Sequence, residues 1–195
     1  MKKFMPWIII GALVLICCFT ACGAYNGIVE KSNLAEQKWA DVESAYQRRS
    51  DLIPNIVNTV KGYATHEKST LEEIVAERAK ATQPQINFDE INDQTLAQYQ
   101  KAQGEVSQAL GRLMAISENY PDLKASQNFA ALQDELSGTE NRINVARRDF
   151  NDAIKQYNTT IQTFPRNIIA GMFGYSKKSP FAAEAGAEKA PTVEF

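Results

Sequence analysis

The sequence predicts an all-α protein, an antiparallel bundle of three to four long helices that follows an N-terminal membrane segment. Three observations support this prediction. The chain opens with an uncharged apolar segment, two long stretches place core-type side chains at alternating steps of three and four residues, and no stretch alternates apolar and polar residues for long enough to form a sheet. Helices joined by short loops then pack into a bundle.

The N-terminal segment, residues 1–24, is expected to anchor the protein in a membrane. Residues 4–24 carry no charge, and about 20 apolar residues suffice for a helix to cross the hydrocarbon core. Lys2 and Lys3 precede them, so the positive-inside rule keeps the N-terminus cytoplasmic and places the rest of the chain outside the cytoplasm. The competing interpretation is a lipoprotein signal, in which Cys22 would be acylated after cleavage. The residues before Cys22 resemble a lipobox, although Phe19 stands where Leu is usual and the apolar segment exceeds the usual length of about 7 to 15 residues.

The first long helix is predicted from a stripe that begins at residue 35. Pro54 lies inside this stripe, and because the phase is kept across it, we expect a kinked or locally loosened helix rather than two unrelated ones. The helix either continues to about Ala81 or breaks near Gly62, and residues 82–89 form a loop. The stripe consists of Ala35, Trp39, Val42, Tyr46, Arg49, Ile53, Ile56, Val60 and Tyr63.

Two further helices complete the predicted bundle, which spans residues 25–165. The second contains Leu96, Tyr99, Val106, Leu110, Leu113 and Ile116, and the turn at residues 119–122 ends it. Pro165 stops the third, because the residue before a proline avoids the helical conformation. The aromatic side chains of these stripes are expected in the core. The third stripe consists of Phe129, Leu132, Leu136, Thr139, Ile143, Ala146, Phe150, Ala153, Tyr157, Thr160 and Phe164.

Residues 166–195 form a C-terminal tail that the bundle stripes do not include. Its apolar, glycine-punctuated start at residues 168–175 either folds back on the bundle or remains available to a partner or the bilayer, because exposed apolar patches of that size are uncommon. Aromatic residues and Met are the types that anchor interfaces. The candidate partner-binding residues are Met172, Phe173, Tyr175, Phe181 and Phe195.

Composition argues against nucleic-acid binding and against the commonest catalytic chemistry. The chain after the apolar segment contains 19 of the 21 basic residues and all 23 acidic ones, so its net charge is negative. It therefore offers no basic surface to a phosphate backbone. All three cysteines lie in the apolar segment, and the single histidine, His66, lies beside Glu67 in a polar stretch. No zinc spacing and no phosphate-binding glycine loop is present. We therefore expect no catalytic site, no metal and no cofactor.

Arg49 is an unusual member of the first stripe, because its position predicts a core-facing guanidinium. Such a group must find a partner or lose its hydration without compensation. Asp149 or Glu140 on the third helix could supply the partner, and Arg49–Asp149 is the candidate structural ion pair. An internal pair would set the register of the helices. The alternative is that Arg49 flanks the seam and reaches water.

Three segments of the chain resemble the LemA family. The first is Arg48–Asn55, with Val60–Ala64 and His66-Glu67; the second is Arg148–Asn151, with Tyr157-Asn158 and Phe164-Pro165; the third is Gly171–Gly174, with Phe181 and the ending up to Phe195. The resemblance implies a single N-terminal membrane segment followed by a bundle of long helices, and no agreed biochemical activity. The cysteines of the anchor depart from the family pattern and bring the uncleaved span into question.

These observations predict a membrane-anchored, non-catalytic scaffold or interaction protein of the bacterial cell envelope, whose partners are other envelope proteins. A lipid-binding or envelope-remodelling module is the alternative, and it would need basic flanks near the membrane, for which Lys31, Lys177 and Lys178 are the candidates. An enzyme with an unrecognised carboxylate site is the third hypothesis, although pairs such as Glu72-Glu73 are typical of exposed helix surfaces.

Overall fold

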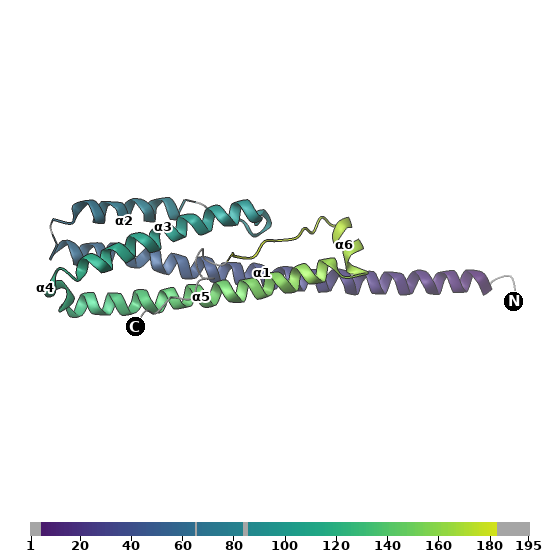
Figure 1. The fold of residues 1–195 in the computed structure, drawn as a ribbon. Coiled ribbons are helices and arrows are strands. Elements are labelled where there is room, and N and C mark those ends of the chain that lie inside the picture. The colour runs from purple at the N-terminus through teal and green to yellow at the C-terminus, as the bar shows by residue number, and fades with distance from the viewer. Residues whose placement is uncertain (1–4, 65, 84–85, 183–195) are drawn as a thin grey trace, which may run out of the picture.

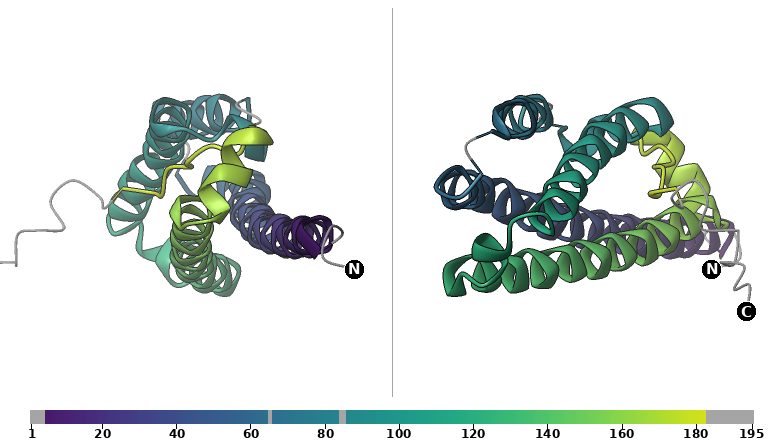
Figure 2. Two further views of the ribbon diagram at one scale, coloured as in Figure 1. Left: turned by 90° about the vertical axis from the view of Figure 1, so that its right-hand side faces the viewer. Right: turned by 60° about the vertical axis from the view of Figure 1, so that its left-hand side comes forward.

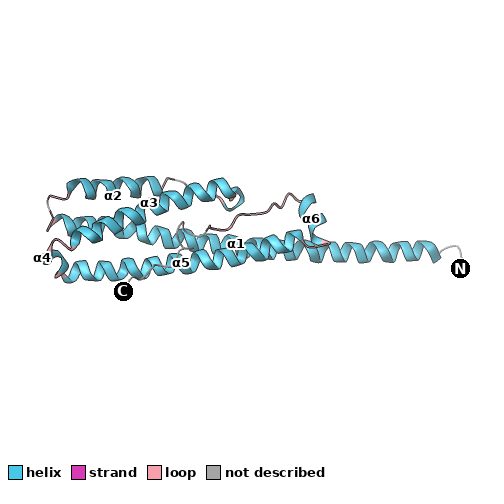
Figure 3. Cartoon of the chain, viewed as in Figure 1, coloured by secondary structure: helices cyan, strands magenta, loops and turns pink. Residues whose placement is uncertain are grey.

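The computed structural model describes residues 5–64, 66–83 and 86–182, and no strand occurs among them. The all-α prediction is confirmed (Figures 1 and 3). The elements are α1 (Met5–Lys61), α2 (Lys68–Ala81), the 3-10 turn η1 (Phe88–Glu90), α3 (Asp93–Ser117), α4 (Pro121–Lys124), α5 (Gln127–Gln162) and α6 (Arg166–Met172).

The four long helices α1, α2, α3 and α5 run alternately in opposite directions, as short connections require (Figure 1). They form two closely packed pairs, α1 with α5 and α2 with α3. The short helix α6 lies against both α1 and α5, and the first part of α1 extends beyond the other helices (Figure 1). Figure 2 shows the same helices from two further directions. The bundle is therefore two helix pairs that side chains must hold together.

Helix α1 is continuous from the apolar segment into the bundle. Its N-terminal part is long and apolar enough to cross a membrane, and its large side chains from Trp7 to Phe19 are exposed wherever they are described. The helix ends at Lys61, next to Gly62, and α2 begins only at Lys68. The first helix thus breaks near Gly62, which decides between the two alternatives left by the sequence.

Pro54 remains inside α1, and a side chain from α2 compensates for the hydrogen bond it removes. Proline has no N–H, so the carbonyl of Ser50, one turn earlier, has no donor within the helix. Arg78 Nε donates to this carbonyl oxygen at 2.8 Å. The contact satisfies a buried acceptor and also joins α2 to α1.

Local signals set the ends of the other helices. Asn92 caps α3: its Oδ1 accepts from the backbone N–H of Gln94 at 2.9 Å and of Thr95 at 3.0 Å, and Thr95 Oγ1 accepts from Asn92 N at 3.1 Å. Pro121 occupies the first position of α4, where its missing N–H costs nothing. Helix α5 ends at Gln162, shortly before Pro165, as predicted.

The core consists of two apolar clusters separated along the bundle axis. The cluster nearer the apolar segment gathers side chains around Trp39, Phe150 and Tyr157, and the distal cluster gathers side chains around Ile56, Leu113 and Phe129. Two aromatic residues assigned to the core, Tyr63 and Phe164, are instead exposed, because each lies just beyond the last residue of its helix. Polar side chains occupy the layer between the clusters: Arg49, Ser50, Gln103, Ser107, Thr139 and Glu140.

The described part of the tail folds back along α5. Asn158 accepts from Lys178 N at 3.0 Å and donates to Lys178 O at 2.7 Å. Two helical turns earlier, Asn151 accepts from Phe181 N at 2.8 Å and donates to Phe181 O at 3.2 Å. Each asparagine thereby hydrogen-bonds the extended chain as a neighbouring strand would, with one donor and one acceptor. The chain near Lys178 and Phe181 is thus held along α5, whereas Ile168, Met172 and Phe173 in the apolar start of the tail are exposed.

The arrangement at Pro54 predicts a measurable coupling between two distant residues. Arg78→Met should lower the free energy of unfolding by about 1–2 kcal/mol, because it leaves the buried Ser50 carbonyl without a donor. In a Pro54→Ala background the new N–H at position 54 supplies that bond, so the same change should cost markedly less. Chemical denaturation of the four proteins in detergent measures the cycle. Equal costs in both backgrounds would contradict this account of Arg78.

Candidate functional site

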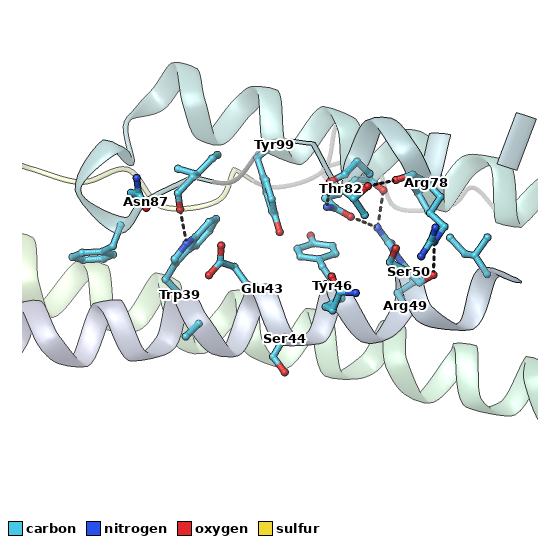
Figure 4. Close-up of a pocket in the computed structure, with 18 of the residues that line it drawn as sticks. Trp39, Glu43, Ser44, Tyr46, Arg49, Ser50, Arg78, Thr82, Asn87 and Tyr99 are labelled. Carbon is cyan, nitrogen blue, oxygen red and sulfur yellow. Dashed lines mark hydrogen bonds between the residues drawn. The ribbon is translucent and has the colours of Figure 1, made fainter. Parts of the chain in front are cut away.

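The structure contains a groove of about 520 Å³ between α1 and the α2–α3 pair. Figure 4 shows Trp39, Glu43 and Tyr46 of α1 facing Tyr99 of α3, whereas Ser44 points away from them. The segment from Ile86 to Phe88, which leads into η1, lines one end. At the other end, the groove meets the polar layer at Arg49 and Ser50.

Trp39 fixes the aromatic wall of the groove. Its Nε1–H donates to the carbonyl oxygen of Ile86 at 3.1 Å, which ties the loop before η1 to α1. The indole lies 5.3 Å from the ring of Tyr99 and 5.4 Å from that of Phe150, in tilted geometries that aromatic pairs favour. The wall is thus held from α1, α3 and α5 at once.

Arg49 is almost fully buried, with 1% of its surface exposed, and its guanidinium is satisfied on several sides. Nη1 donates to Ser107 Oγ at 2.6 Å and to Glu140 Oε1 at 2.9 Å. Nη2 donates to the backbone oxygen of Gln103 at 2.9 Å and to its Oε1 at 2.7 Å. The guanidinium also lies over the ring of Tyr46, 5.0 Å from its centre.

Gln103 extends this network to a fourth helix. While its Oε1 accepts from Arg49, its Nε2 donates to the carbonyl oxygen of Ala81, the last residue of α2, at 3.2 Å. Arg49 on α1 is therefore connected to α2 and α3 through Gln103 and to α5 through Glu140. The core-facing position predicted for Arg49 is observed.

The ion-pair partner of Arg49 is Glu140 and not Asp149. Asp149 lies nine residues closer to the C-terminal end of α5 than Glu140, and its carboxylate is 3.6 Å from Lys38 Nζ. Glu140 lies between the two apolar clusters, at the level of Arg49. The candidate pair Arg49–Asp149 is corrected accordingly.

Glu43 lines the groove and remains exposed to solvent. Partial burial beside the aromatic wall raises the pKa of Glu43, and a contact with Trp39 opposes that rise. Burial likewise raises the pKa of the Tyr99 hydroxyl, and the charge of Glu43 adds to the effect. Glu43 makes no ion pair with a described Lys or Arg side chain. A cation entering the groove would therefore stabilise the ionised carboxylate.

The candidate tail residues divide into three groups. Met172 and Phe173 are exposed, while Tyr175 is partly buried, 6.4 Å from the ring of Tyr25. Phe181 is buried between Trp39 and Phe150, with ring centres 6.1 and 5.6 Å away. Phe195 lies outside the described residues. Phe181 therefore belongs to the core and is not available to a partner.

Lys178 also differs from its expected role as a basic flank for lipid. It is buried, donates from Nζ to the backbone oxygen of Asp89 at 3.1 Å, and lies over the ring of Phe88 at 4.6 Å. Burial lowers the pKa of Lys178, and the nearby Asp89 carboxylate opposes this. Its ammonium group locks η1 to the tail and cannot reach a bilayer surface.

The remaining residues singled out by the sequence lie away from the groove. Cys22 is exposed on α1, and His66 is exposed in the turn before α2. Within the described residues, no group of three His, Cys, Asp or Glu side chains could hold a metal ion.

Comparison with known proteins assigns the fold to a family. The family model described as the LemA family matches residues 38–195. This chain belongs to the LemA family. Because the match begins well after the apolar segment, it rests on the groove helices, the polar layer and the tail, and not on the anchor.

Three similar proteins carry two different names, MamQ and LemA. Magnetosome proteins MamQ 1 and MamQ 2 of Paramagnetospirillum magneticum are each 26% identical over 186 residues, covering 87% of this chain and 68% of their own. Protein LemA of Metamycoplasma hominis is 26% identical over 152 residues, covering 78% of this chain and 66% of its own.

Sequence reasoning did not identify Gln103, Ser107 or Glu43 as members of a site. Gln103 had a signal: it lies four residues after Tyr99 and three before Val106, so the same stepping that marked Arg49 places it in the core. Ser107 and Glu43 lie beside their stripes, and only the packing of α1 against α3 and α5 reveals their neighbours.

Two adjacent arginines provide a matched test of the buried network. Arg49→Met should lower the free energy of unfolding by about 3–5 kcal/mol, because it removes one partner from a buried network. Arg48→Met should cost no more than about 1 kcal/mol, because the Arg48–Glu135 pair is half exposed on both sides. Thermal and chemical denaturation of the two variants measures both losses of unfolding free energy. Similar losses would show that the buried Arg49 contributes no more to stability than the exposed Arg48.

Proposed function

We propose that this LemA-family chain is a non-catalytic scaffold or interaction protein of the bacterial cell envelope, tethered to a membrane with its bundle outside the cytoplasm. Lys2 and Lys3 before the apolar segment support this orientation through the positive-inside rule. The unbroken α1 supports a tether of fixed geometry, because no loop separates the apolar segment from the bundle. The bundle would then present one face at a defined height above the membrane.

The observation that carries the proposal is the groove that includes the exposed Glu43. Aromatic rings of Trp39, Tyr46 and Tyr99 line it, and such surfaces serve in protein interfaces as well as in cation binding. The carboxylate of Glu43 lacks a cation within the described chain. The partner that fits is a protein segment that presents a Lys or Arg side chain flanked by apolar residues.

Among the residues that the structure describes, none of the groove's side chains form a catalytic constellation, which supports a binding role. His66 is exposed in a turn outside the groove, and the cationic groups at the polar end are engaged: Arg49 by Gln103 and Glu140, and Arg78 by Ser50. The hydroxyl of Tyr99 has a raised pKa, which makes it a poor base at neutral pH. Binding explains the groove with fewer assumptions than catalysis.

The alternative of a lipid-binding or envelope-remodelling module has little support from the basic flanks that it would need. Of its three candidate basic flanks, Lys178 is buried and Lys31 lies 3.6 Å from Glu30, which leaves Lys177. Surface recruitment to anionic lipid gains about 1 kcal/mol per basic side chain, so this set is small for remodelling.

A photo-crosslinking residue at Ala40, which is exposed and lines the groove, tests the proposed function in cells. We expect it to capture a discrete envelope protein, and Glu43→Lys in the same chain should abolish the capture through like-charge repulsion. The same probe at Val145, an exposed position on α5 that does not line the groove, is the matched control. Equal capture at both positions, or capture unaffected by Glu43→Lys, would overturn the groove as the partner site.

A further inference from the structure

Four large apolar side chains are exposed together where α5 gives way to α6. The exposed fractions are 81% for Phe164, 54% for Ile168, 75% for Met172 and 61% for Phe173. This set is named the α5–α6 apolar tip. Exposed large apolar side chains are common singly, but a group within ten residues of chain indicates a contact surface.

The α5–α6 apolar tip lies beside the part of α1 that leaves the bundle toward the apolar segment (Figure 1). Phe173 contacts Tyr25, with ring centres 4.8 Å apart. The guanidinium of Arg166 lies so close to Gly27 that an added Cβ there would be 3.6 Å from its Nε. The tip is thus placed at the level of residues 25–27 of α1, and Ala24 and Ile28, which flank these residues in α1, are buried.

The length of the uncharged part of α1 determines how far this level is from a bilayer. Residues 4–29 carry no charge, and these 26 residues at about 1.5 Å each extend about 39 Å. The hydrocarbon core is about 30 Å thick and the whole bilayer about 40–45 Å. Residues 25–27 therefore fall in the interfacial layer of a bilayer spanned by this helix, and the α5–α6 apolar tip falls there with them.

Lipid anchoring leads to the same level. If the chain were acylated at Cys22, the acyl chains would enter the membrane one helical turn before Tyr25. The tip would again meet the surface of the bilayer. The position of the tip does not depend on which anchor the protein carries.

We propose that the α5–α6 apolar tip inserts into the interfacial layer of the membrane that anchors α1, and that phospholipid is the partner it fits. Phe164, Met172 and Phe173 would reach the boundary between headgroups and acyl chains, as the apolar faces of interfacial helices do. Tyr25 and Tyr175 lie at the depth where amphipathic rings are favoured. The exposed guanidinium of Arg166 lies at the depth of the lipid phosphates.

Depth-dependent quenching tests this contact in the full chain. Phe164→Trp and Met172→Trp each add an indole at the tip, and Tyr63→Trp adds one at the far end of α1, where Tyr63 is 47% exposed. Each protein is reconstituted in phosphatidylcholine vesicles with or without brominated acyl chains, and wild-type emission from Trp7 and Trp39 is subtracted. At the tip, roughly half or more of the added emission should be lost in brominated lipid, while the emission of Tyr63→Trp should not change.

The outcomes separate lipid from other occupants. Equal quenching of the three variants, or ready quenching of the tip variants by iodide in vesicles, would overturn the proposal. Protection from iodide in native membranes but not in vesicles would assign the tip to a protein partner and would also overturn it. Thermal melts followed by circular dichroism in detergent establish that each variant is folded, because a folded variant melts as the wild type does. Phe164→Trp and Met172→Trp should give the same result, since both report on the tip.

Discussion

The burial of one guanidinium constrains the whole bundle. Apolar stripes repeat every three to four residues, so apolar packing alone would tolerate a helix displaced by one turn. Arg49 does not tolerate it, because its donors require the oxygens of Gln103, Ser107 and Glu140 at one level. A displaced α3 or α5 would leave a buried charge without partners. Arg49 therefore fixes the axial register of the two helix pairs. It also lies between the two apolar clusters of the core.

Several residues of the LemA-like sequence pattern make hydrogen bonds to backbone N–H and C=O groups that would otherwise lack a partner. In the segment Arg48–Asn55, Arg49 builds the polar layer. Pro54 leaves the carbonyl of Ser50 without a donor inside the helix, and Arg78 of α2 donates to that oxygen. In the second segment, Asn151 and Asn158 hold the extended tail by paired donors and acceptors. These residues are engaged within the fold, which leaves the exposed groove positions and the tip as the surfaces open to other molecules.

The sequence was sufficient for the helices and insufficient for the contacts between them. Stepping by three and four residues identified the faces of the long helices and the buried position of Arg49, because amphipathicity is a local property of the chain. The choice between Glu140 and Asp149 was not local, since both acids lie on α5 and only its axial position relative to α1 distinguishes them. The burial of Phe181 and Lys178 had no periodic signal either, because an extended tail takes its environment from the helix it crosses.

Because α1 is continuous, the position of the bundle is coupled to the orientation of the apolar segment. From residue 25 to Lys61 the helix has 37 residues, which at about 1.5 Å each is a rigid arm of about 55 Å beyond the apolar segment. Membrane helices tilt by about 20° on average, and that tilt would carry the far end of such an arm sideways by about 19 Å. If the apolar segment spans the membrane, a change in its tilt, to which bilayer thickness contributes, would shift the lateral position of the distal apolar cluster. A loop between the apolar segment and the bundle would remove this relation, and α1 runs without interruption from Met5 to Lys61.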